Sequence, residues 1–236
     1  MASILNILRP EVDATVASLA ATEFKIDPIA GRRYSLIPAV IGSAQKRHGT
    51  LIEKAIVAAV DASPNYSAWR LPEFCISNDA IGIVARVNNV KKTPDWLDIL
   101  EQTLAYGNVA KTVQIDLMAY NRETKFLCAL EIKRGYSHHD AGKKKAILKD
   151  TLCIHMLLRS YGERIDGLNV RRAESKICNF YKNREFADQI MLDKDELDDY
   201  FGADILRPVE EVNHYFRQQI HEMLGRRLAA EDEVEE

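Results

Sequence analysis

The chain has 236 residues, of which 47% are hydrophobic and 28% are charged, the balance of an ordinary globular protein. Its formal net charge is −3, but residues 231–236 hold five acids, and the rest carries 32 basic against 30 acidic residues, or +2. This balance argues against a histone-like protein that binds by bulk charge alone, and it leaves a nucleic-acid partner open.

The cysteines and the apolar runs indicate in which cellular compartment the protein is expected. The four cysteines form no C-x-x-C pair, so a zinc ribbon or an iron–sulfur site has little support. Three of them lie in apolar runs, where we expect free thiols in the core, as in a reducing cytoplasm. The N-terminus is too short and polar for a signal peptide, and no apolar run approaches the ~18 residues of a membrane span. We therefore expect a cytoplasmic protein without a membrane contact.

Hydrophobic spacing indicates the first elements. A helix is predicted over 3–22, where Pro10 permits two short helices or one kinked helix. Residues 24–42 are punctuated by proline and glycine and are expected to be irregular. A second helix is predicted over 43–62, with Ser43 as its N-cap.

The rest of the chain alternates between the two periodicities. The predicted elements are one or two strands within 73–90, including 81–87, a helix over 95–106, a strand over 111–120, a hairpin loop at 121–125, a strand over 126–133, a helix over 141–161 capped by Gly162, a strand over 174–181, a short acidic helix near 193–201 and an amphipathic helix over 209–228. This order predicts a mixed α/β protein, with a central mixed sheet flanked by helices and helical additions at both ends.

The predicted hairpin carries a group of charged residues. Glu131 and Lys133 lie two apart at the end of an apolar strand, so their side chains share a face. Asp116 lies on the preceding strand, where pairing through the 121–125 loop would bring it near Glu131. Two carboxylates at short range suit Mg²⁺, and a neighbouring ammonium can orient water and stabilise a pentavalent phosphorus.

The pattern of an acid, any residue and lysine is weak by itself. It occurs four times, beginning at Glu23, Glu123, Glu131 and Glu174. Only the third ends an apolar β run that directly follows another run with an embedded aspartate. The alternative is a solvated surface pair, but the almost wholly apolar residues 126–130 indicate a strand buried on both faces.

At this point the layout resembles the PD-(D/E)xK, or restriction-endonuclease-like, nuclease superfamily, over about residues 43–181. The resemblance implies an αβββαβ core, with Asp116 and Glu131 as ligands of Mg²⁺, which Mn²⁺ would replace, and Lys133 as the catalytic lysine. It also implies a catalytic role for Glu53 on the preceding helix, for which a surface charge beside Lys54 is the alternative. Ile115 stands where the family often has proline.

The resemblance also implies an organisation and an activity. The expected segments are a helical arm over 1–42, the nuclease core over 43–181, a helical extension over 182–230 and a disordered acidic tail over 231–236. The size suits an orthodox type II restriction endonuclease, a homodimer that cleaves double-stranded DNA and leaves 5′-phosphates. This finer assignment rests on analogy of size and layout.

Basic residues after the motif support a phosphate-rich partner. The expected nucleic-acid contacts are Arg134, His138, Lys143, Lys144, Lys145, Lys46 and Arg47. For the three helix lysines the alternative is a solvated face, but lysines normally avoid a helix N-terminus, and this misfit favours phosphate contact. For His138 and His139 the favoured alternative is an ordinary loop position, and His155 is expected in the core. No phosphate-binding glycine motif is present, so no nucleotide cofactor is expected.

Three alternatives to a restriction enzyme stay open. The first is another nuclease of the superfamily, such as a junction resolvase, a repair nuclease or an RNA-cleaving defence protein. The second is a non-catalytic nucleic-acid-binding module on the same scaffold, against which the three filled catalytic positions count. The third is a structural partner protein with a charged hairpin, which predicts neither metal-dependent stabilisation nor affinity for DNA.

Overall fold

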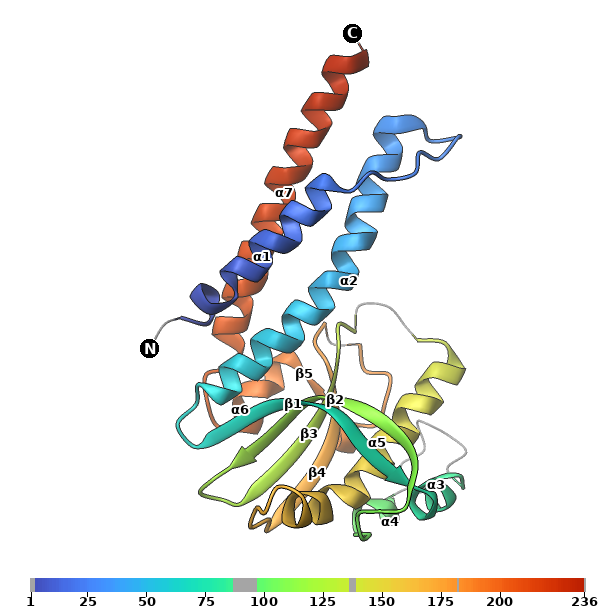
Figure 1. Cartoon of the computed structure of the whole chain (residues 1–236), viewed down its shortest axis with the longest axis vertical. Coiled ribbons are helices and arrows are strands. Elements are labelled where there is room, and N and C mark those ends of the chain that lie inside the picture. Colours follow the sequence, from blue (N-terminus) through green and yellow to red (C-terminus); the bar gives the residue numbers. More distant parts are fainter. Residues whose placement is uncertain (1–2, 87–96, 136–138, 182, 236) are drawn as a thin grey trace. The chain divides into compact units, whose positions relative to one another are not determined.

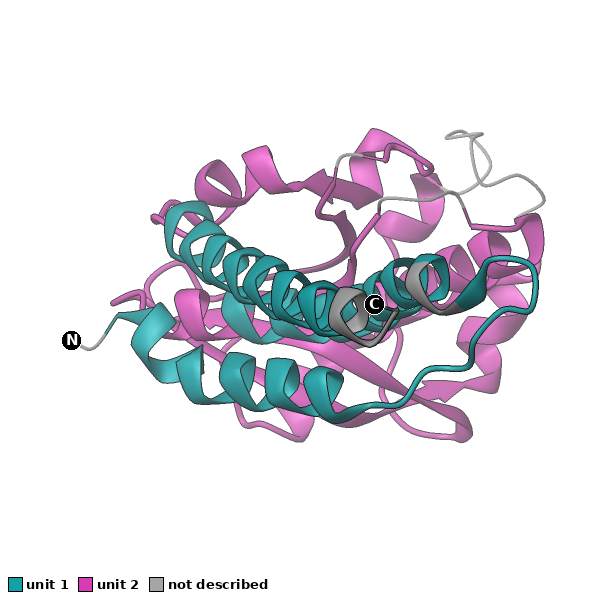
Figure 2. Ribbon diagram, turned by 90° about the horizontal axis from the view of Figure 1, so that it is seen from above, with its two compact units in different colours: residues 1–56, 206–236 teal, residues 57–205 magenta. Residues whose placement is uncertain are grey.

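The structure is a computed structural model that describes residues 3–86, 97–135, 139–181 and 183–235, with the backbone alone for 32–33 and 231–235 (Figure 1). The chain divides into two compact units. Residues 1–56 and 206–236 form the first unit, and residues 57–205 form the second (Figure 2).

The first unit is helical. It contains α1 (Ile4–Ala21), all but the last residues of α2 (Gly31–Asp61), and α7 (Leu206–Glu235). Helices α1 and α7, from opposite ends of the chain, pack against each other. Among the described residues, no helix combines the length and the apolar character needed to cross a membrane.

Polar contacts tie the two terminal helices together. The hydroxyl of Tyr215 on α7 donates to Asp13 Oδ1 on α1 at 2.7 Å. Near the other end of α1, the guanidinium of Arg227 donates to the carbonyl oxygens of Leu19 and Thr22, both at 3.1 Å. These bonds supplement a buried apolar stripe on α1, whose residues are spaced three and four apart as one helix face requires.

Two expectations for this unit are corrected. Residues 31–42 are helical and belong to α2, which passes through Pro38. Leu36, Val40 and Ala44 are buried at four-residue spacing, so the apolar stripe of the predicted helix already begins before the proline. Helix α7 continues to Glu235, into the acidic segment that we expected to be disordered.

The second unit is built on a five-stranded mixed sheet in the order β1-β2-β3-β4-β5. Strands β1, β2 and β3 pair antiparallel, and β3, β4 and β5 pair parallel. The strands are β1 (Tyr66–Ser77), β2 (Val109–Asn121), β3 (Phe126–Lys133), β4 (Arg172–Asn179) and β5 (Met191–Asp193). The predicted mixed α/β architecture is confirmed at this level, including the hairpin of β2 and β3.

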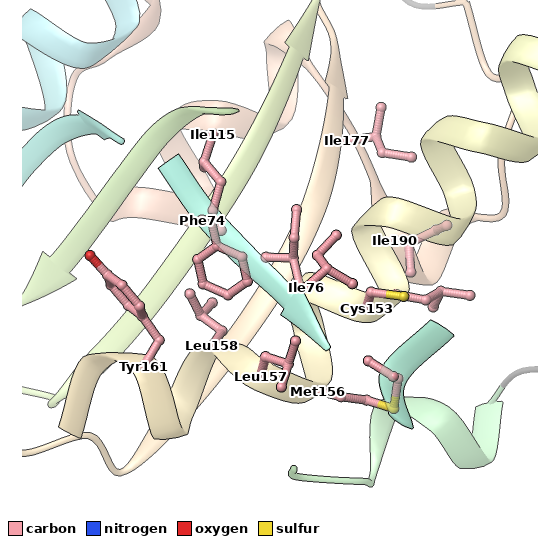
Figure 3. Close-up of a cluster of buried hydrophobic side chains, with 14 of the residues drawn as sticks. Phe74, Ile76, Ile115, Cys153, Met156, Leu157, Leu158, Tyr161, Ile177 and Ile190 are labelled. Atoms are coloured by element: carbon pink, nitrogen blue, oxygen red, sulfur yellow. The ribbon is translucent and has the colours of Figure 1, made fainter. Parts of the chain in front are cut away.

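Helix α5 (Ala141–Arg164) covers one face of this sheet. Its apolar side chains, among them Leu157 and Leu158, interlock with Phe74, Ile115 and Ile177 from the strands (Figure 3). On the opposite face lies the short helix α6 (Leu197–Phe201). Its aromatic rings pack edge to face against β-strand rings, Tyr200 against Phe126 and Phe201 against Tyr66. Two short 3₁₀ helices, Asp188–Ile190 and Lys194–Glu196, flank β5.

The predicted strand at 81–87 is wrong as far as the structure describes it, because the segment begins as helix α3 (Asn78–Val84). Ser77 is the N-cap, and its hydroxyl accepts a hydrogen bond from the Ala80 amide. The polar residues that suggested a turn between two strands are therefore a helix start. Ala80 and Val84, four apart, are buried in the core.

The predicted helix over 95–106 is largely wrong. Only α4 (Leu97–Leu100) is helical in the described part, which begins at residue 97. The amide of Leu104 donates to the Met156 carbonyl, and the amide of Tyr106 donates to Ser160 Oγ. Helix α5 thus takes the hydrogen-bond donors that a longer α4 would have used within itself.

Gly162 does not cap α5, as we expected, but lies buried inside it. A Cβ atom built there would lie 2.6 Å from Leu127 Cδ2 and 3.0 Å from Val170 Cγ2. The glycine therefore permits the close approach of α5 to β3. Gly225 in α7 is the opposite case, because nothing lies within 4 Å of its added Cβ.

The replacement Gly162→Ala should lower the free energy of unfolding by about 1–3 kcal/mol, since the methyl group overfills a packed contact. Gly225→Ala is the matched control, and it should stabilise the protein by up to about 1 kcal/mol through helix propensity. Urea denaturation of both variants measures the difference. Equal effects on stability would show that α5 is not held closely to β3 at this glycine.

Candidate active site

The charged group predicted on the hairpin assembles in the second unit. Leu117 pairs with Leu130, and Met118 pairs with Ala129, so Asp116 and Glu131 are the residues directly beyond the last pair of the hairpin register. Glu131 and Lys133 follow Ala129 at two-residue spacing and share its face, which is the face covered by α5. The hairpin therefore provides the neighbourhood that its sequence pattern indicated.

A β-bulge in β2 adjoins the aspartate. Trp69 pairs with Met118 and Leu71 with Ile115, so two steps along β1 match three steps along β2. Ile115 and Met118 both belong to the core cluster under α5, which strict alternation would not allow. The extra residue lies between them, in the stretch that contains Asp116. Bulges of this kind redirect side chains and are frequent beside active sites.

Hydrogen bonds hold the aspartate in place. The backbone amide of Ile132 donates to Asp116 Oδ2 at 2.9 Å, and Gln114 Nε2 lies 3.4 Å from Oδ1. Lys133 Nζ is 3.7 Å from Asp116 Oδ2 and forms an ion pair with Glu131 Oε1. One ammonium thus contacts both carboxylates.

Burial gives the group an electrostatic asymmetry. The side chain of Asp116 is 9% exposed, whereas those of Glu131 and Lys133 are 27% and 26% exposed. Burial raises the pKa of Glu131 above its usual value, Asp116 and Asp150 add to the rise, and Lys133 opposes it. Glu131 is therefore a carboxylate for which added positive charge would be favourable.

The donor set suits a hard divalent cation. Among the described residues no group of three or more histidine, cysteine, aspartate or glutamate side chains could hold a metal ion. Mg²⁺, however, is commonly bound through one or two carboxylates, with water and substrate phosphate completing its shell. Asp116 and Glu131 supply such a pair. The main-chain carbonyl of Ile132 is a further candidate oxygen ligand. The N–H and C=O of one strand residue point to the same side, and the N–H of Ile132 points toward Asp116 on β2.

The three lysines predicted to contact phosphate do not share one environment. Lys143 and Lys145 are exposed in the first turns of α5. Lys144 instead forms an ion pair with the fully buried carboxylate of Glu185, at 2.8 Å. Lys144 thus has an internal partner, and its contact with phosphate stays a prediction.

The remaining candidates differ in their surroundings. The guanidinium of Arg134 lies over the Tyr181 ring, 5.4 Å from its centroid. His138 lies outside the described residues, and Nδ1 of His139 is 3.2 Å from Glu185 Oε1. His155, which we expected in the core, is half-buried on α5. Its Nε2 lies 3.0 Å from the Leu100 carbonyl oxygen, its Nδ1 accepts from the Ser175 amide at 3.1 Å, and burial lowers its pKa.

Three of the predicted site residues belong to the first unit. Glu53 and Arg47 are half-buried on α2, and Lys46 is exposed there. Arg47 donates to the Thr15 carbonyl at 3.2 Å, and Lys54 beside Glu53 bonds to Glu11 at 2.6 Å. The group of Asp116, Glu131 and Lys133 is built from the second unit alone, and a role for these three residues stays a prediction.

Sequence reasoning missed an ion pair and a buried acid near the group. Asp150 on α5 pairs with Lys111 on β2 and acts on Glu131 electrostatically. Glu185 is fully buried and bonds to the loop that follows β3. Gln114, two residues before Asp116, could have been found from spacing along the strand. Nothing in the local sequence indicates the pair of Lys111 with Asp150 or the buried Glu185, because their partners are distant in sequence.

Comparisons of this chain with protein-family models, with curated proteins and with solved structures found no match.

Asp116→Ala should lower the free energy of unfolding by about 1–3 kcal/mol more than Asp116→Asn does. The alanine leaves the buried Ile132 amide without its acceptor, whereas the asparagine oxygen can replace the carboxylate oxygen. Urea denaturation in EDTA measures both variants without a metal contribution. If the two variants are equally stable, the bond from Ile132 to Asp116 does not hold this strand end.

Proposed function

We propose that this chain is a nuclease of the PD-(D/E)xK type that hydrolyses phosphodiester bonds in DNA with Mg²⁺. The observation that carries the proposal is the meeting of Asp116, Glu131 and Lys133. A single ammonium lies 3.7 Å from the aspartate and pairs with the glutamate. Two acids from adjacent strands can hold a metal ion for phosphodiester hydrolysis, and a neighbouring amine can stabilise the charge that develops on the phosphate.

The order of elements supports the same proposal. Apart from the short helices α3 and α4 between β1 and β2, the chain runs through helix α2, strands β1, β2 and β3, helix α5 and strand β4, which is the αβββαβ order of that superfamily. The first three strands are antiparallel, and β4 returns parallel to β3 after α5. The Glu-x-Lys pair ends β3, directly before this crossover. A fold by itself does not imply a function, so the site carries more of the argument than the topology.

Asp116 and Glu131 would hold the cation. When bound, Mg²⁺ would activate a water molecule as nucleophile and neutralise charge on the scissile phosphate. The partly exposed Glu131 leaves room for substrate, and its raised pKa favours a cationic partner. The hydrogen bond from the Ile132 amide holds the Asp116 carboxylate beside β3.

Lys133 would act on the reacting phosphate. Its ammonium can donate hydrogen bonds to the attacking water and to the phosphate oxygens, where negative charge grows as phosphorus becomes pentavalent. The attacking water would lose a proton to solvent as its oxygen bonds to phosphorus, and the bond to the 3′ oxygen would break. The 3′ oxygen would take a proton from solvent, which leaves a 3′-hydroxyl on one fragment and a 5′-phosphate on the other. Before substrate arrives, the two carboxylates hold the ammonium in this position.

The finer assignment is a restriction-type endonuclease that cuts both strands of duplex DNA as a homodimer. Exposed lysines support a duplex partner, since Lys143 and Lys145 lie at the start of α5, shortly after the catalytic strand. Backbone phosphates of DNA are bound through such side chains and helix N-termini.

Lys133→Ala should lower the rate of DNA cleavage by about 10²–10³-fold, because it removes a donor to the transition state. Plasmid and phage DNA with Mg²⁺, and with EDTA in its place, provide the assay. We expect cleavage by the parent protein in Mg²⁺ and none in EDTA.

Lys176→Ala is the matched control for this prediction. Lys176 is the lysine of another Glu-x-Lys sequence on the adjacent strand β4, and it donates to the Gln189 carbonyl. The control should cleave like the parent. Cleavage by Lys133→Ala at the parental rate would rule out the proposed site, and intact binding without any cleavage by the parent would favour a non-catalytic DNA-binding module.

Replacing Lys143 and Lys145 together by alanine should weaken binding to duplex DNA. The slope of log K against log salt concentration should fall by about 0.9 for each lysine that neutralises a phosphate. Fluorescence anisotropy in EDTA measures binding without cleavage. Lys125→Ala with Lys176→Ala removes the same charge elsewhere in the unit and should leave the slope unchanged. An equal loss in both double variants would indicate a general charge effect.

A further inference from the structure

A polar network with two buried members, Asn179 and Glu185, joins the end of β4 to the start of α5. We call it the clasp, and it consists of Asn179, Asn183, Glu185, His139 and Lys144. All five residues belong to the second unit. The proposed function assigns no role to the clasp.

Glu185 is the centre of the clasp. Its side chain has no exposed surface, yet it accepts hydrogen bonds from the His139 amide at 3.1 Å, from Lys144 Nζ at 2.8 Å and from Asn183 Nδ2 at 2.8 Å. Burial by itself would raise the pKa of Glu185, but the bonds from Lys144 and His139 outweigh it and lower the pKa. A buried carboxylate with this many donors fixes the segments that supply them.

The clasp reaches β3 through Asn179. This residue is fully buried at the end of β4, paired with Lys133 in the parallel register. Its Nδ2 donates to the Asn183 carbonyl at 2.6 Å, and its Oδ1 is buried without a donor in the described part of the chain. A buried amide of this kind calls for an explanation beyond packing.

The chain after Lys133 is closely guided along β4. The amide of Phe180 donates to the Lys133 carbonyl at 2.9 Å. Gly135 has φ +65°, and a Cβ added to it would lie 2.8 Å from Asn179 Cβ. Gly135, the second residue after Lys133, therefore lies directly against Asn179.

We propose that Glu185 is a positioning residue, which fixes the path of the chain directly after Lys133 and so holds the ammonium between the two carboxylates. The inference rests on the proposed function, because it assigns Glu185 to the support of that site. Glu185 acts through the crossover, as groups behind a catalytic side chain do when they set its orientation.

The test compares Glu185→Gln with Glu174→Gln. Glu174 is the control, since its side chain is only 13% exposed, is paired with Arg172, and lies on β4 beyond the site. In Glu185→Gln we expect backbone amides of residues 132–135 and 139–144 to exchange hydrogen about tenfold faster. We also expect kcat for DNA cleavage to fall about 10–100-fold with KM little changed. The control should change neither the local exchange nor kcat.

A second variant guards against a folding defect. The double replacement Glu185→Gln with Lys144→Met removes both charges of the pair, which is better tolerated than leaving one unpaired. It should fold and still show fast exchange at residues 132–135 with a low kcat. Measurements well below the unfolding temperature keep global unfolding out of both readouts.

The outcomes separate the inference from the proposed function. If the parent cleaves DNA but Glu185→Gln matches the control in exchange and kcat, the positioning role is wrong and the nuclease stands. If the parent cleaves no DNA with Mg²⁺, the nuclease proposal fails and the catalytic role of Glu185 falls with it. In that case the exchange data still show whether the clasp holds the end of β3.

Discussion

The ammonium of Lys133 is shared by two carboxylates at the end of a buried sheet, and much of the surrounding structure follows from this requirement. Without the shared cation, Asp116 and Glu131 would face each other as like charges in a poorly hydrated place. The bulge in β2, the amide of Ile132 and the pairing of β3 with β4 all restrict where these groups can lie. In our proposal a divalent cation binds the same two carboxylates, because Lys133 neutralises only part of their negative charge.

The start of α5 illustrates how charge is distributed around this group. Lysines near a helix N-terminus oppose the helix dipole, and we first interpreted all three of them as phosphate contacts. The structure separates them, because the carboxylate of Glu185 neutralises Lys144 internally while Lys143 and Lys145 remain exposed. Asp140 caps the helix through the Lys143 amide, so the N-terminus also has an acid of its own.

Much of the fold was predictable, and the errors share a cause. The strands of the hairpin and the helix at 141–161 were correct because their apolar periodicity is long and uninterrupted. The errors at 31–42, at 81–87 and around 101–106 fell on short segments with proline, glycine or polar residues. There the deciding partners are distant: the donors of Leu104 and Tyr106 are taken by α5, and Gly162 is buried because Leu127 lies against it.

For the candidate site, local sequence was sufficient to place Glu131 and Lys133 on one face and to bring Asp116 near them. Side-chain alternation and a short hairpin loop act over a few residues, so they can be inferred without the rest of the chain. The bulge beside Asp116, its bond to Ile132 and the clasp around Glu185 could come only from the packed fold. The bulge depends on the pairing of β2 with β1, and the clasp depends on β4 and the crossover. The bond joins β2 to β3 where the bulge redirects Asp116, and burial over the whole unit decides these registers.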